Sequence, residues 1–154
     1  MKLFYAAVSA IIVNSKNEIL LVSPDGKTKW QTITGWVENE TIDEAMIREI
    51  KEELQIKDFR LIEIIDSHYF KYDNKDIIST FYLVKYDNGE ITANEDIVGY
   101  VHKWFDRNEI RNVSISCPDQ FQIIEKAFFA IDHYSKDNYS SHDFYKYKWQ
   151  DVKI

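Results

Sequence analysis

The sequence contains few of the residues that form disulfides, flexible linkers or membrane spans. Its 154 residues include one cysteine, two prolines and four glycines. One cysteine cannot form an intramolecular disulfide, and so little proline and glycine leaves little material for a linker. No stretch approaches the roughly 20 apolar residues that a membrane-spanning helix needs. We therefore expect a reduced, cytoplasmic protein with no membrane partner.

Positive charge is also scarce, since 19 Lys and Arg residues stand against 26 Asp and Glu residues, for a net charge of −7. Proteins that bind duplex nucleic acid usually present a basic face, so this balance argues against such a partner. Apolar residues make up 45% of the chain and aromatic residues 15%, as in globular proteins and unlike disordered ones. The apolar run near the N-terminus is only about ten residues long and is interrupted by Ser9, so it fits a strand better than a signal peptide.

Hydrophobic periodicity and turn residues divide the chain into strands and two longer helices. Residues 4–13 and 18–22 read as a hairpin, residues 23–29 as a loop, and residues 30–37 as extended chain. Further strands are predicted at 59–72, 76–86 and 100–105, a short helix at 106–111, and a second amphipathic helix from Pro118 to about Ile131, with a stripe of Phe121, Ile124, Phe128 and Ile131. This pattern predicts an α+β fold in which a mixed sheet packs in a sandwich with helices.

The segment from Thr41 to Gln55 changes to a helical period. Apolar side chains recur at spacings of three and four, and Thr41 stands three residues before Glu44, as in a capping box. We predict an amphipathic helix over residues 42–55.

Three carboxylates of this helix, Glu49, Glu52 and Glu53, lie at i, i+3 and i+4 and so share one face. Their charges repel one another, and Arg48 can offset part of the repulsion through pairs with Glu44 and Glu52. A solvated charged face and a cation-binding face both fit this spacing, which alone does not decide between them.

The longer string GWVENETIDEAMIREIKEELQI resembles the signature of the Nudix hydrolases: Gly, five residues, Glu, seven residues, Arg-Glu, an apolar residue, any residue, Glu-Glu, any residue, Gly, and an apolar residue. Glu40, Arg48, Glu49, Glu52 and Glu53 all fall in place. Two positions depart from the signature. Four residues, not five, separate Gly35 from Glu40, and Gln55 stands at the second Gly.

The resemblance implies a Nudix-type α/β/α sandwich and hydrolysis of a phosphoric anhydride with Mg²⁺, or with Mn²⁺, which accepts the same ligands. It implies Glu49 and Glu53 as metal ligands, Glu52 as a ligand or the general base, and Arg48 as the residue that orients a catalytic Glu. Which Glu is the base differs among members of the family. Three further metal contacts are carried over: the carbonyl of Gly35, Glu95 with Asp96 as its neighbour, and Glu38.

The strings KWQTITGWVE and HKWFDRNEI resemble the subgroup of dATP pyrophosphohydrolases and dihydroneopterin triphosphate diphosphatases. This resemblance implies a nucleoside or pterin triphosphate as substrate and pyrophosphate as product. Dinucleoside polyphosphates or nucleotide sugars are the alternative substrates, and a non-catalytic nucleotide-sensing domain is the alternative of another class. We expect substrate contacts from four residues, Lys27, Lys29, Trp30 and Thr34, although strand aromatics are more often core.

The chain is expected to form a single domain over residues 1–154, with its core at about 5–131. The remaining residues 133–154 form an extension rich in Tyr, Phe and Trp but also highly charged. It shows no clean period. Two interpretations stay open for it, a surface extension packed on the domain or a contact between two copies of a homodimer.

Overall fold

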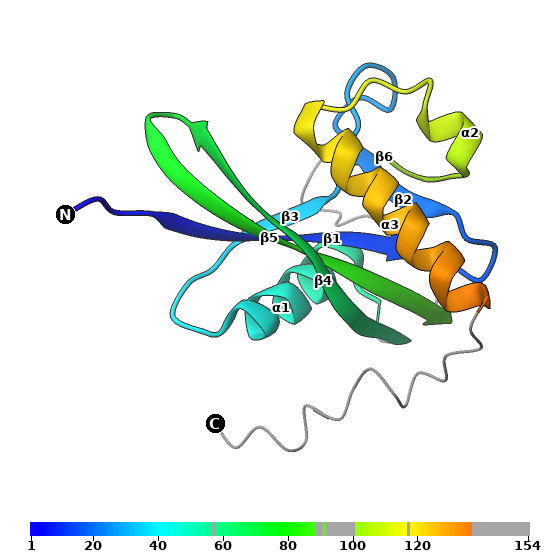
Figure 1. Ribbon diagram of the computed structural model, residues 1–154, viewed down its shortest axis with the longest axis horizontal. Coiled ribbons are helices and arrows are strands. Elements are labelled where there is room, and N and C mark those ends of the chain that lie inside the picture. The colour runs from blue at the N-terminus through cyan, green and yellow to red at the C-terminus, as the bar shows by residue number, and fades with distance from the viewer. Residues whose placement is uncertain (57, 89–90, 92–100, 117, 137–154) are drawn as a thin grey trace.

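The computed structural model describes residues 1–56, 58–88, 91, 101–116 and 118–136 (Figure 1). Its elements, in chain order, are β1 (Tyr5–Val13), β2 (Ile19–Ser23), β3 (Ile33–Trp36), α1 (Ile42–Leu54), β4 (Asp58–Tyr72), β5 (Lys75–Asn88), β6 (Val101–Phe105), α2 (Arg107–Ile110) and α3 (Pro118–Lys136). Glu95, Asp96, Cys117 and the tail from residue 137 lie outside the described residues. Among the helices described, none combines the length and apolarity that crossing a membrane requires.

The described strands form one mixed sheet in the order β4-β5-β1-β2-β6, with β3 paired to residues 7–10 of β1. β1 runs parallel to β5, whereas the other strand pairs are antiparallel. The prediction of an α+β fold with a mixed sheet is confirmed.

Successive side chains of the central strands point to opposite faces of the sheet, so a hydrophobic core forms on each face. In β1, Val8, Ala10 and Ile12 belong to the core cluster that includes α1, while Ile11 and Val13 belong to the cluster that includes α3. Figure 1 shows α1 and α3 packed against the middle of the sheet, while the β4–β5 hairpin and the start of β1 extend beyond both helices.

Several helix and strand boundaries in the structure differ from the predicted ones. α3 continues to Lys136, beyond the predicted end at about residue 131, and Phe121 of the predicted stripe is only half-buried while Ile123 is buried. The extended segment predicted at 30–37 is a strand only from Ile33, because Trp30 pairs with Ile115 through a single bridge. The predicted turn after β4 is confirmed, with Asp73 and Asn74 at positive φ; Lys75, assigned to that turn, already begins β5.

Candidate active site

α1 is held at its first turn by two sets of side-chain contacts. The predicted capping box is present: Thr41 Oγ1 accepts from the Glu44 amide at 3.2 Å, and Glu44 Oε2 accepts from the Thr41 amide at 2.8 Å. The hydroxyl of buried Tyr82, on β5, donates to the carboxylate of Asp43. Both contacts satisfy groups in the first turn, so the start of the helix, which follows the loop from β3, is fixed against the sheet.

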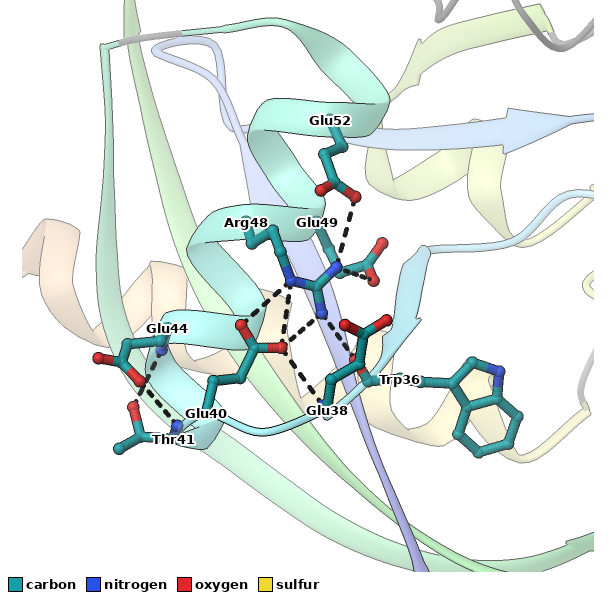
Figure 2. Close-up of polar contacts among 8 residues, drawn as sticks. All are labelled: Trp36, Glu38, Glu40, Thr41, Glu44, Arg48, Glu49 and Glu52. Atoms are coloured by element: carbon teal, nitrogen blue, oxygen red, sulfur yellow. Dashed lines mark hydrogen bonds and ion pairs between the residues drawn. The ribbon is translucent and has the colours of Figure 1, made fainter.

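Arg48 is the centre of the polar contacts on this helix (Figure 2). Its guanidinium donates to both carboxylate oxygens of Glu40, to Glu49 Oε1 at 2.8 Å, and to the Trp36 carbonyl at 2.9 Å. It also reaches the exposed carboxylate of Glu52 at 3.3 Å. The guanidinium thus fixes one carboxylate oxygen of Glu49, and the catalytic role that the family resemblance implies for Arg48 stays a prediction.

One of the predicted Arg48 pairs, with Glu44, is replaced by a pair with Glu40. The Glu44 carboxylate accepts from the Thr41 amide instead. Glu40, eight residues before Arg48, accepts three of its hydrogen bonds. The i,i+4 rule describes only side chains on the helix surface, and it could not anticipate a carboxylate supplied by the loop that precedes the helix.

Gly35 and Glu49 lie so close that no other residue fits at position 35 without a shift. A Cβ added to Gly35 would overlap the carboxyl carbon, Cγ and Oε1 of Glu49. Gly35 does not have a positive φ, so the requirement is for space rather than for a left-handed backbone. The structure thus brings together two residues predicted as metal contacts.

Glu49 and Glu53 are poorly solvated carboxylates. Burial raises the pKa of Glu49; the Arg48 guanidinium opposes this rise, and the charges of Glu52 and Glu38 add to it. Burial also raises the pKa of Glu53, and the charges of Glu49 and Glu52 raise it further. Within the described part of the chain, Glu53 makes no hydrogen bond or ion pair. A cation bound here would relieve this unfavourable electrostatic arrangement.

The other acidic residues of the loop and helix differ from this pair. Arg48 lowers the pKa of Glu40, which is thus held as a carboxylate. Glu52 has a side chain 58% exposed, and Glu38 is exposed at the loop. Both side chains are therefore accessible from solvent.

The described residues contain no group of three or more His, Cys, Asp or Glu side chains close enough together to hold a metal ion. The donor set nevertheless fits Mg²⁺, which is usually bound through one or two carboxylates, several waters and the phosphates of a substrate. Glu49 and Glu53 would supply the two carboxylates, next to the backbone of Gly35.

The residues predicted to contact substrate do not lie in one environment. Lys27 and Lys29 are exposed in the loop after β2, and Thr34 is exposed on β3 with its hydroxyl 2.8 Å from that of Ser9. Trp30 is only 6% exposed and packs edge-on against Phe105, in the core cluster that includes α3. All four substrate contacts stay predictions.

The sequence analysis overlooked Trp36, the residue after Gly35. Its carbonyl accepts from Arg48, and its side chain is exposed at 43%. Alternation along β3 could have identified it, because Ile33 and Gly35 face α1 and the residue between or after them must face the other side.

Comparison with known families matches residues 3–127 to the NUDIX domain model. A comparison with curated protein sequences gave no match. The E. coli ORF135 protein in solution is 25% identical, with a TM-score of 0.65 over 86% of this chain and 92% of that one.

Two other solved structures share the fold at lower identity. A binary complex of the C. elegans Ap4A hydrolase is 20% identical, with a TM-score of 0.66 over 82% of this chain and 98% of that one. The NUDIX domain of Shewanella oneidensis NrtR, complexed with ADP ribose, is 14% identical, with a TM-score of 0.65 over 85% of this chain and 90% of that one.

Proposed function

We propose that this chain, which belongs to the Nudix family of hydrolases acting on phosphoric anhydrides, releases pyrophosphate from a nucleoside or pterin triphosphate in a reaction that depends on a divalent cation. The observation that carries the proposal is the poorly solvated pair Glu49 and Glu53 beside Gly35, oriented by Arg48. Such a pair is unfavourable without a cation and becomes favourable with one.

Charged side chains of α1 have separate roles in the proposed reaction. Arg48 holds one oxygen of Glu49, so the other oxygen is left to face a ligand. Glu53, which has no cationic partner within the described residues, would share the same ligand. A bound divalent cation would neutralise phosphate charge and lower the pKa of water. Exposed Glu52 is our candidate for the general base, because the attacking water arrives from solvent.

The choice of a triphosphate rests on the string from Lys29 to Glu38, which includes β3 and Gly35 and which resembles the triphosphate-cleaving subgroup. A second candidate, a dinucleoside polyphosphate, is favoured by the fold shared with the C. elegans Ap4A hydrolase. The phosphate-binding end of the site suits both, because it contacts the anhydride and not the groups attached to it.

The test is a phosphate-release screen with dATP, GTP, dihydroneopterin triphosphate, ADP-ribose and diadenosine tetraphosphate. Each triphosphate is assayed with Mg²⁺, with and without added inorganic pyrophosphatase. ADP-ribose and diadenosine tetraphosphate are assayed with Mg²⁺ and added alkaline phosphatase, because their hydrolysis gives phosphomonoesters and no inorganic phosphate. We expect phosphate from a triphosphate only when pyrophosphatase is present, because pyrophosphate is the product. A higher kcat/KM for ADP-ribose or the dinucleotide would refute the triphosphate proposal. Absence of turnover with every substrate would favour a sensing domain.

A further inference from the structure

An exposed aromatic cluster includes Trp36, the residue that follows Gly35 in β3. The rings of Tyr5 and Trp36 meet edge to face, with centroids 6.2 Å apart, and the two residues are 50% and 43% exposed. The Lys75 ammonium lies 5.4 Å from the centroid of the Tyr5 ring and 5.9 Å from that of Trp36. We refer to Tyr5, Trp36 and Lys75 as the Trp36 cluster.

The Trp36 cluster and the carboxylates lie on opposite faces of β3. Trp36 pairs with Ala7 and so shares the sheet face of α3, whereas Gly35 faces Glu49 and α1. Figure 2 shows the Trp36 indole directed away from the carboxylates while its carbonyl points to Arg48. Among the described strands, β3 pairs with β1 alone, and its residues Gly35 and Trp36 present the two faces side by side along the chain.

The Lys75 ammonium has no acidic partner among the described residues, where its charge faces only the two rings. A second cluster of the same kind, Lys2 with Phe4 and Tyr69, provides a contrast. Its rings are also 6.2 Å apart, but the Lys2 ammonium pairs with Asp76 at 3.6 Å, and Tyr69 donates to the same carboxylate. Of these two clusters of described residues, the Trp36 cluster is the one that combines exposed aromatic side chains with a lysine that has no acidic partner among the described residues.

A planar group attached to a polyanion is the ligand that suits this combination. Aromatic faces stack on heterocyclic bases, and a nearby ammonium attracts the phosphates that the carboxylates alone would repel. We propose that the Trp36 cluster is the subsite for the base of the substrate. Trp36 and Tyr5 stack on this base, and Lys75 faces the phosphates of the substrate. This inference rests on the proposed triphosphate function and names the part of the site that distinguishes a base-bearing substrate from bare phosphate.

The test compares a base-bearing triphosphate with inorganic tripolyphosphate, which has the same phosphate chain and no base. The variants are Trp36→Leu and Tyr5→Leu, and Tyr69→Leu is the matched control, because Tyr69 is 46% exposed and belongs to the second cluster. Because a base stacked on an aromatic ring loses that contact when the ring is removed, we expect Trp36→Leu to raise KM for the best of dATP, GTP and dihydroneopterin triphosphate about tenfold. Its effect on tripolyphosphate, and that of Tyr69→Leu on either substrate, should be less than about twofold.

Equal losses on both substrates would overturn the inference, because the indole would then act through Arg48 and not on the base. Unchanged kinetics in Trp36→Leu would overturn it as well. Calorimetric binding of the same three triphosphates to the Glu53→Gln variant, with and without Trp36→Leu, separates this inference from the proposed function. Binding that requires Trp36 supports the subsite even if wild-type protein turns over no triphosphate, and binding that ignores Trp36 refutes the subsite even if turnover is found.

Discussion

Gly35→Ala places a single methyl group against the side chain that the proposed mechanism most needs. The added carbon would overlap the carboxyl group and Cγ of Glu49. β3 is held to β1 over four residue pairs, whereas Glu49 is a flexible side chain, so the side chain is expected to move and the strand to stay. The hydrogen bond from Arg48 to Glu49 would then be lost.

The effects on stability and activity should differ greatly in size. The Arg48–Glu49 pair is partly exposed, so its loss should cost about 1 kcal/mol or less, and Ala stabilises a strand by about 0.5–1 kcal/mol relative to Gly. These effects nearly cancel, and the melting temperature should change by less than about 4 °C. By contrast, moving a reacting group by about 1 Å can lower the rate about 10²-fold. We therefore expect a folded protein with about a hundredth of the activity.

The assay is a Mg²⁺ titration of turnover, together with thermal unfolding in EDTA. Gly26→Ala is the control, because Gly26 has a φ of +68° and a side chain there meets Val101 rather than a carboxylate. The control should lower the melting temperature and leave the Mg²⁺ concentration for half-maximal rate unchanged, whereas Gly35→Ala should raise that concentration. If Gly35→Ala keeps both the wild-type rate and the wild-type Mg²⁺ response, Glu49 and the backbone at Gly35 do not form the metal site.

Three further outcomes are expected. Glu53→Gln should lower the rate at least about 10²-fold, because a metal ligand is lost. It should also raise the melting temperature in EDTA by about 1 °C, since it removes a repulsion between carboxylates of a few tenths of a kcal/mol. A lower melting temperature would contradict this repulsion. The folded-state pKa values of Glu49 and Glu53 lie above their unfolded values, so their contribution to stability is present at low pH and lost as pH rises through the raised pKa. The free energy of unfolding measured with urea in EDTA should therefore be higher at pH 5.5 than at pH 7. The difference between the two pH values should be smaller in Glu53→Gln. Arg48→Lys should lower kcat about tenfold, because a single ammonium cannot bind Glu40, Glu49 and the Trp36 carbonyl at the same time. A wild-type kcat would show that the orientation of Glu49 is unimportant.

The elements with a regular period could be predicted from the sequence. The start of α1 and its capping box were predicted because a strong helical period coincides with local capping chemistry, whereas the helix ends at Leu54, one residue before the predicted end. The start of β3 was placed too early, since its register depends on pairing with the distant β1 and on the single bridge from Trp30 to Ile115. Long-range pairing leaves little signal in a single short segment.

The site was predictable where it follows a local motif and not where it depends on tertiary contacts. The resemblance identified the helix carboxylates, but neither spacing nor motif could indicate that Gly35 touches Glu49 or that Glu40 binds Arg48. Trp36 was overlooked because a tryptophan after a glycine is compatible with core and surface alike. Its place opposite Ala7 on β1 shows that it lies on the face away from α1, in agreement with the alternation along β3.

Arg48 stabilises both the shortened loop before α1 and the carboxylates that repel one another on this helix. Four residues between Gly35 and Glu40 still allow Glu40 to reach the guanidinium, which also binds the Trp36 carbonyl. Arg48 therefore closes the loop onto the helix and cancels part of the charge of Glu49 in the absence of a cation. Because Glu53 receives no such compensation within the described residues, its charge remains available for a cation, and the stability that this charge costs the metal-free protein should be recovered when Mg²⁺ binds.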